Sequence, residues 1–136
     1  MGMFLGVYNP NMTEGSRIAF PKKHREQLGS GGVVLSQGFE KCVLVYDKND
    51  WVTAAQKQID NSSDQIKVRD LERYLYSFAT EAFIDAQGRL VIPAALKDYA
   101  GIRDKTAVVG VGDHVEIWDA QIWKDYSADI SKKLAV

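Results

Sequence analysis

The sequence has little cysteine, almost no net charge and no long apolar run, and each shortage narrows the possible functions. Its one cysteine, Cys42, cannot form an intrachain disulfide, which is typical of the reducing cytoplasm. Cys42 lies beside Val43 and Val45, so we expect it to be packed rather than reactive. No segment approaches the ~18 apolar residues of a membrane span, and the N-terminus lacks a secretory pattern. We therefore expect a cytoplasmic protein without a membrane partner.

The balance of charge gives no overall attraction to a polyanion. Lys and Arg number 17 and Asp and Glu number 18, for a formal net charge of −1. Any binding to nucleic acid must therefore depend on local clusters or on assembly of several copies. With 136 residues, 46% of them hydrophobic, the chain is long enough for one compact domain with its own core.

The most informative feature is an internal repeat. A shift of 72 positions places residues 13–21 on residues 85–93, and the alignment continues without a gap. The aligned pairs are Arg17 with Arg89, Pro21 with Pro93, Gly29 with Gly101, Gly38 with Gly110, Val43 with Val115, Asp47 with Asp119 and Trp51 with Trp123. Similarity at a fixed offset indicates a duplicated structural unit. Two copies are too few for a solenoid, so we expect two halves that complete one another.

Each copy predicts the same order of elements: strand, turn, strand, short helix and hairpin. One copy has roughly 45 residues, which is marginal for an independent fold. We therefore predict a mixed α+β fold in which both copies interleave their strands in one β-rich core. The predicted segments are strands at 4–8 and 17–20, a helix at 22–28 ending at Gly29 and hairpin strands at 33–35 and 42–46, then strands at 82–84 and 89–92, a helix at 93–99 ending near Gly101 and hairpin strands at 107–111 and 115–118.

Longer helices are predicted after each copy. Asp47, the segment 61–64 and Asp119 can cap helices, and apolar residues recur at helical spacing in the segments that follow. The predicted apolar stripes are Leu71, Tyr74, Leu75 and Phe78 in one helix, and Trp123, Tyr126, Ile130 and Leu134 in the last. The expected organisation is a first unit at 7–50, connecting helices at 51–78, a second unit at 79–122 and a C-terminal helix at 123–136.

The strongest chemical pattern is the turn that precedes Arg89. Gly88 suits a tight turn with positive φ. Asp85 can accept hydrogen bonds from that turn and orient the guanidinium group of Arg89. The turn would then present a rigid arginine at the rim of the β-core. An Asp–Arg pair that only stabilises the turn is the alternative, but the arginine recurs in both copies, which favours a function.

A cluster of cations follows the first of the two arginines. Arg17, Lys22, Lys23 and Arg25 occur with no acidic residue among them, since the next one is Glu26, and this pattern suits phosphate contacts. A helix that is merely solvated is the alternative. The second copy is poorer in cations, with Arg89 and Lys97 but two alanines in place of the lysines.

Catalytic and metal-binding patterns are absent from the sequence. His24 and His114 occur in unlike contexts, and neither has the spacing of metal ligands. His114 follows Asp113 in a predicted hairpin turn, where we expect a solvated side chain. The glycines at 110 and 112 lack the third glycine and the helix of a nucleotide-binding fingerprint. We expect no enzyme, no metal and no cofactor.

These residues resemble the MraZ family of bacterial transcriptional regulators, which are built from two tandem AbrB-like units. The resemblance covers essentially the whole chain, through residues 3–6, 17–21, 85–93 and 115–119. It implies a swapped-hairpin (double-split) β-barrel with flanking helices, a ring-shaped homo-oligomer (an octamer or larger) and association with the nucleoid. It also implies binding to G-rich direct repeats in double-stranded DNA upstream of the division and cell-wall operon. By motif match, Arg17 and Arg89 would contact DNA.

The first turn departs from the pattern of that family. Thr13 stands where the family has Asp, Ser16 where Gly is usual, and Gly15 comes one place earlier. The Thr13 hydroxyl can still accept a hydrogen bond from the turn, but it cannot form an ion pair with Arg17. Arg17 is then either held less rigidly or left with its charge free for DNA. A second class of function also stays open, a ring-forming adaptor that binds other proteins, and the salt dependence of DNA binding distinguishes the two.

Overall fold

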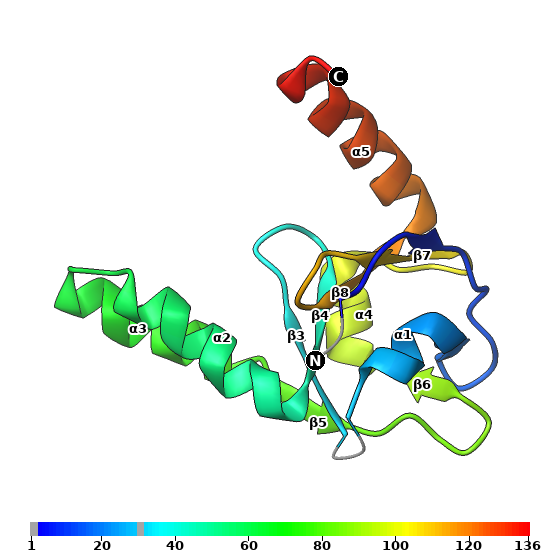
Figure 1. Cartoon of the computed structure of the whole chain (residues 1–136), viewed down its shortest axis with the longest axis horizontal. Coiled ribbons are helices and arrows are strands. Elements are labelled where there is room, and N and C mark those ends of the chain that lie inside the picture. The colour runs from blue at the N-terminus through cyan, green and yellow to red at the C-terminus, as the bar shows by residue number, and fades with distance from the viewer. Residues whose placement is uncertain (1–2, 30–31) are drawn as a thin grey trace.

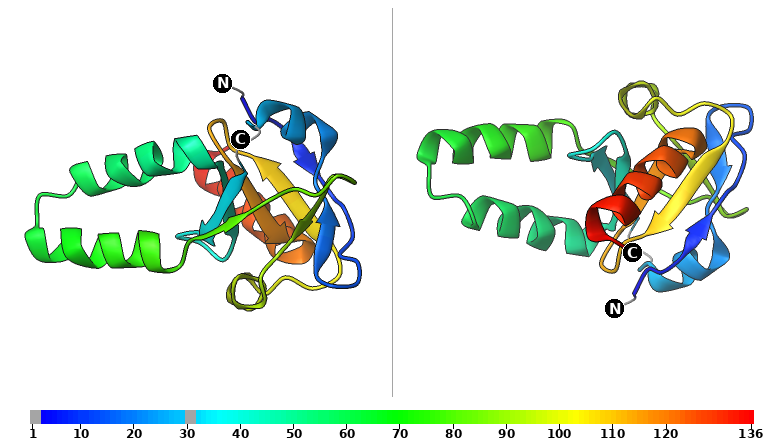
Figure 2. Two further views of the ribbon diagram at one scale, coloured as in Figure 1. Left: turned by 90° about the horizontal axis from the view of Figure 1, so that it is seen from below. Right: turned by 90° about the horizontal axis from the view of Figure 1, so that it is seen from above.

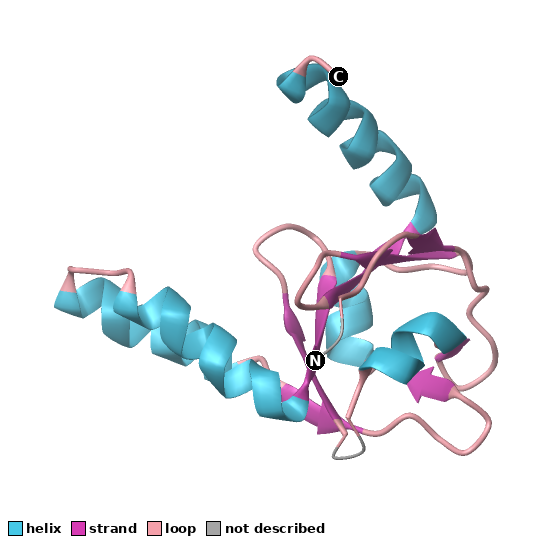
Figure 3. Cartoon of the chain, viewed as in Figure 1, coloured by secondary structure: helices cyan, strands magenta, loops and turns pink. Residues whose placement is uncertain are grey.

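The computed structural model describes residues 3–29 and 32–136, which form a mixed α+β fold (Figure 1). Figure 3 distinguishes the central strands from the helices that surround them. The elements in chain order are β1 (Val7–Tyr8), β2 (Arg17–Ala19), α1 (Lys22–Gln27), β3 (Val33–Gln37), β4 (Val43–Asp47), α2 (Lys48–Asp60), α3 (Gln65–Ser77), β5 (Thr80–Ala82), β6 (Arg89–Val91), α4 (Ala94–Ala100), β7 (Thr106–Gly110), β8 (Val115–Asp119) and α5 (Ala120–Leu134).

The strands of the two copies interleave, as the repeat predicts. Six strands form an antiparallel sheet in the order β1-β7-β8-β4-β3-β5, and β2 and β6 form a separate pair. The first strand of each copy joins the hairpin of the other copy, because β1 pairs with β7 and β5 pairs with β3. No strand pairing in the described part of the chain closes the two sheets into a single barrel, so the swapped-hairpin barrel stays a prediction.

An approximate two-fold axis relates the copies. Ile18 lies opposite Leu90 in the β2–β6 pair, and Leu44 lies opposite Glu116 in the β4–β8 pair. In both cases the opposed residues are 72 positions apart and are therefore equivalent positions of the two copies. Each of these central pairings needs one strand from each copy, so neither copy can form it alone.

The strand pairings of the two copies do not follow the gapless sequence alignment at every position. Val33 lies opposite Asp47, whereas Thr106 lies opposite Asp119, so β3 and β7 correspond with a shift of 73 rather than 72. Gly38 is therefore not the structural counterpart of Gly110. The first hairpin has one more loop residue, at 38–42 against 111–114, and this extra residue displaces β3.

The four central strands of the six-stranded sheet, β7, β8, β4 and β3, are buried on both faces. Side chains alternate across a strand, so Val43 and Val45 of β4 pack towards the β2–β6 pair while Leu44 and Tyr46 pack towards the longer helices. Every residue of β4 is buried. The helices α2 and α3 lie side by side and project from the sheet, and α5 extends away from it (Figures 1 and 2). In the described part of the chain, no helix combines the length and apolar character that a membrane span needs.

The caps are confirmed, but some predicted boundaries are wrong. Asp47 and Asp119 accept hydrogen bonds from the first turns of α2 and α5, and within the predicted segment 61–64 it is Asp64 that accepts them from the first turn of α3. Gly101 ends α4 in the left-handed region, with φ of 65°. Gly29 does not end α1 in this way, because the extended Leu28 ends that helix and the N–H of Gly29 donates to the Asp47 carboxylate. The glycine-rich segment 29–32, which its composition predicts to be a loop, lies partly outside the described residues.

The first strand of each copy differs from its prediction. Only Val7–Tyr8 forms β1 within the predicted 4–8, because Gly6 has φ of 85° and interrupts the extended backbone. In the second copy, β5 comes earlier than the predicted 82–84 because its pairing with β3 begins at Thr80. The apolar stripes are only partly covered: Leu75 is buried, whereas Phe78 is exposed and no residue of α5 is fully buried.

Candidate nucleic-acid interface

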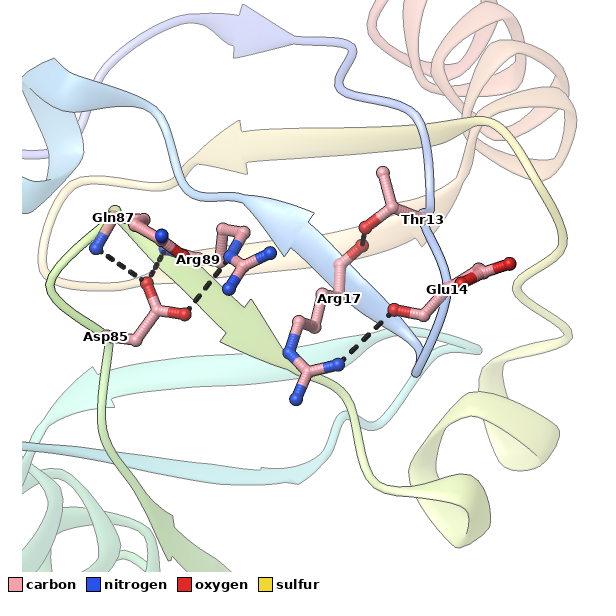
Figure 4. Close-up of polar contacts among 6 residues, drawn as sticks. All are labelled: Thr13, Glu14, Arg17, Asp85, Gln87 and Arg89. Atoms are coloured by element: carbon pink, nitrogen blue, oxygen red, sulfur yellow. Dashed lines mark hydrogen bonds and ion pairs between the residues drawn. The ribbon is translucent and has the colours of Figure 1, made fainter.

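The two predicted DNA-contacting arginines lie on the same face of the β2–β6 ribbon (Figure 4). Ile18 and Leu90 are fully buried on one face of the ribbon. Alternation of side chains then directs Arg17 and Arg89 to the opposite face. The ribbon therefore presents both guanidinium groups outward from an anchored apolar base.

The arrangement of the two arginines follows from the strand register. Arg17 lies opposite Val91 and Arg89 lies opposite Ala19, so the two arginines are diagonal neighbours. Such neighbours have Cβ atoms about 7–8 Å apart in an antiparallel pair. Ala19 and the exposed Val91 bring neither charge nor much bulk to the space between them. Two further hydrogen bonds extend the ribbon with two-fold symmetry, from Phe20 N–H to the Gly88 carbonyl and from Ile92 N–H to the Ser16 carbonyl, each 2.8 Å.

Asp85 fixes the turn before Arg89 in the predicted manner. Its carboxylate accepts hydrogen bonds from the backbone N–H groups of Gln87 (2.9 Å) and Arg89 (2.8 Å) and from Arg89 Nε (3.1 Å). Gly88 occupies the turn with φ of 78°. The backbone hydrogen bond from Arg89, assisted by the one from Gln87 and by the guanidinium charge, lowers the pKa of Asp85. The direction of Arg89 is therefore set by its backbone and by its side chain together.

The turn before Arg17 is held differently. The Thr13 hydroxyl donates a hydrogen bond to the Arg17 carbonyl (3.1 Å), across the turn. That carbonyl also accepts from Thr13 N–H (2.8 Å), and it therefore lies within reach of the hydroxyl as well. Arg17 Nη1 makes only a long contact (3.4 Å) to the carbonyl of Glu14. Among the described residues Arg17 has no carboxylate partner, and its side chain is less constrained than that of Arg89.

The other predicted cations divide into two groups. Lys22 and Lys23 are exposed at the beginning of α1, beside the ribbon in sequence and open to solvent. Arg25 and Lys97 instead contact turns. Arg25 Nε donates to the Phe20 carbonyl (3.0 Å), and Lys97 Nζ lies 3.4 Å from Ser16 Oγ.

His24 belongs to α1 but not to its charged surface. It is 1% exposed, with the rings of Phe4, Tyr8 and Phe20 around it. Its Nε2 has no hydrogen-bond partner, and burial lowers its pKa. One signal in the sequence pointed to this burial: by the 72-residue shift, His24 aligns with Leu96, a core residue of the second copy.

His114 is not the solvated turn histidine that we expected. Its side chain is only 13% exposed because it stacks on Tyr46, with ring centroids 4.7 Å apart. Its ring nitrogens contact Asp113 (2.7 Å) and Glu116 (3.4 Å). Burial opposes the charge on His114, but hydrogen bonds to Glu116 and Asp113 outweigh it and raise the pKa. No cluster of potential metal ligands occurs within residues 3–29 and 32–136.

Comparison with known proteins reveals the same duplication. The sequence profile of a family described as "MraZ protein, putative antitoxin-like" matches residues 3–74 and again residues 75–135. The chain is 39% identical to a protein of Arthrobacter sp. (strain FB24), over 93% of this chain and 89% of the relative. It is 37% identical to relatives in Micrococcus luteus (93% and 88% covered) and Syntrophomonas wolfei (92% and 87% covered). All three relatives carry the name "Transcriptional regulator MraZ".

Proposed function

The chain belongs to the MraZ family, and we propose that it is a transcriptional regulator that binds specific DNA sequences through Arg17 and Arg89. The relatives' shared name supports the regulatory role. The observation that carries the DNA-binding role is the placement of both arginines on one outward face of the β2–β6 ribbon.

This ribbon suits readout of guanine. The major groove of B-DNA admits a two-stranded β-ribbon, and an arginine can pair with O6 and N7 of a guanine. An arginine whose direction is fixed discriminates better, and Asp85 and Gly88 fix Arg89. Lys22 and Lys23 are exposed beside the ribbon and can contact phosphates. As the resemblance to this family implies, we propose that G-rich direct repeats are the target and that the regulated genes are those of division and cell-wall synthesis.

Successive repeats require several copies of the ribbon. We propose a closed ring of identical chains, an octamer or larger, in which each chain forms a swapped-hairpin barrel. The ring would bind DNA in the cytoplasm, at the nucleoid. The projecting helices and their ends supply exposed apolar side chains for such contacts, including Val52, Ile66, Phe78 and Leu134, each at least 47% exposed. Weak single sites held in one assembly gain affinity through effective concentration.

The test is binding to the DNA upstream of the protein's own gene and to a scrambled duplex across a salt series. Arg89→Ala should reduce the preference for the upstream DNA, because a bidentate arginine contributes ~1–3 kcal/mol of discrimination. Changing both Lys22 and Lys23 to Ala should lower the affinity for both duplexes alike and make that affinity less dependent on salt. If the wild-type protein binds neither duplex in a salt-dependent manner, the proposal fails and an adaptor that binds other proteins becomes the better account.

A further inference from the structure

Arg25 and Lys97 are equivalent positions of the two copies, and each reaches across to the turn of the other copy. Arg25 leaves α1 of the first copy and lies on the turn at Gly88. Lys97 leaves α4 of the second copy and lies 3.4 Å from Ser16, the residue that corresponds to Gly88. The two-fold relationship of the copies thus extends to a pair of cations that connect them.

The contact of Arg25 with Gly88 is close. A Cβ atom at position 88 would lie 2.7 Å from Arg25 Cζ and 2.8 Å from Nη1, so the guanidinium group occupies the space that a side chain would need. A side chain at position 88 would therefore have to displace this guanidinium group as well as adopt the positive φ.

The same guanidinium group completes a chain of hydrogen bonds. Phe20 N–H donates to the Gly88 carbonyl (2.8 Å), and the Phe20 carbonyl accepts from Arg25 Nε (3.0 Å). Arg25 thus holds the strand to which the turn is bonded and covers the turn itself. A planar group with several donors is well suited to this double contact, and an ammonium group is not.

We propose that Arg25 is a positioning residue that fixes the turn presenting Arg89, rather than a contact to DNA phosphate; its effect on specificity rests on the DNA-binding function proposed above. Lys97 is its weaker counterpart for the turn presenting Arg17. The turn of Arg89 is held from within by Asp85 and from the other copy by Arg25. Among the described residues, the turn of Arg17 has no carboxylate contact and no guanidinium contact from the other copy, and only the side chain of Arg17 itself reaches it, at the Glu14 carbonyl (3.4 Å).

The first experiment needs no DNA. Amide hydrogen exchange of residues 85–89 is measured in the wild-type protein and in Arg25→Ala, with Lys22→Ala as the matched control from the same helix. Arg25→Ala should speed exchange in this turn about tenfold, the effect of losing one charge-assisted hydrogen bond, and Lys22→Ala should not. Unchanged exchange in Arg25→Ala overturns the proposal.

A double-variant cycle tests the contact directly. Gly88→Ala should displace the guanidinium group and speed exchange as Arg25→Ala does, so the double variant should be little worse than either single variant. Gly112→Ala is the control for backbone strain, since Gly112 has φ of 81° but nothing within 4 Å of an added Cβ. Effects of Arg25→Ala and Gly88→Ala that add would overturn the contact.

DNA binding then separates positioning from phosphate contact. Arg25→Ala should reduce the ratio of upstream to scrambled affinity about tenfold and leave the salt slope unchanged, and Arg25→Lys should do the same. A phosphate contact would instead lower both affinities alike, reduce the slope by about 1 and be rescued by lysine, which overturns the proposal. Failure of the wild-type protein to bind DNA would refute the proposed function, while the exchange experiment would still decide whether Arg25 holds the turn.

Discussion

Ile18 lies directly opposite Leu90 across β2 and β6, although 72 residues separate them in the chain. Both side chains are fully buried in the same apolar cluster. Since they are equivalent positions of the duplicated unit, the two-fold axis passes between them. The ribbon that carries Arg17 and Arg89 therefore exists only when both copies are folded.

This pairing predicts matched effects of two substitutions on stability. Ile18→Ala and Leu90→Ala should each lower the free energy of unfolding by ~2–5 kcal/mol, because each leaves a cavity in the core. The exposed Val91 is the control, and Val91→Ala should change stability by no more than ~0.5 kcal/mol. Urea denaturation followed by circular dichroism measures all three. Unfolding in two separate steps, each sensitive to only one variant, would contradict the interdependence of the copies.

The unequal turns predict that one substitution can order Arg17. Thr13→Asp places a carboxylate at the position that Asp85 occupies in the second copy, within reach of the backbone and guanidinium of Arg17. NMR relaxation of Arg17 Nε–H should then report a more rigid side chain, while Thr13→Ser should leave it unchanged. Asp85→Thr is the reverse experiment and should make Arg89 more mobile. Equal mobility of Arg17 and Arg89 in the wild-type protein would show that the carboxylate does not matter.

Much of the turn before Arg89 could be predicted from the sequence because its interactions are local. Asp85 and Arg89 are four residues apart, and the spacing alone indicates a turn in which the carboxylate meets the guanidinium. The helix caps are equally local, and the duplication predicts that strands of the two copies interleave.

The features that sequence reasoning missed depend on contacts between distant segments. Burial of His24 requires Phe4 and Tyr8, which only the folding of the N-terminal segment onto α1 brings there. The contact of Arg25 with Gly88 joins the two copies, and the separation of these two residues in the sequence does not predict it. The shift from 72 to 73 at β3 reflects one added loop residue, which an alignment by identical glycines conceals.

His114 should stabilise the fold more in acid than in base. Its pKa is raised in the folded protein by Glu116 and Asp113 against the effect of burial, so the folded state binds its proton more tightly than the unfolded state. That contribution is fully present below the unfolded pKa of about 6.5 and is lost as pH rises through the folded value. His114→Gln should therefore cost more stability at pH ~5.5 than at pH ~8.5. Urea denaturation at both pH values measures the difference, and a cost independent of pH would show that the charge is not involved.

His24 should have the opposite effect on the pH dependence of stability. It lies buried between aromatic rings with Nε2 unpartnered, and burial lowers its pKa. The unfolded state therefore binds the proton first, and stability decreases as pH falls below about 6.5 until the folded value is reached. For one such group the decrease is at most about 1.4 kcal/mol per pH unit.

The test is His24→Leu, which gives the first copy the residue that the second copy has at Leu96. The variant should be more stable than the wild-type protein at pH ~8.5, because it removes an unpartnered buried nitrogen. Its advantage should increase as pH falls through ~6 towards ~5, since the variant has no proton to exclude there. Urea denaturation of both proteins across this range gives the difference in unfolding free energy, in which the contribution of His114 cancels. An advantage that stays constant with pH would mean that His24 binds its proton equally well in the folded and unfolded states. Its burial would then have no bearing on acid stability.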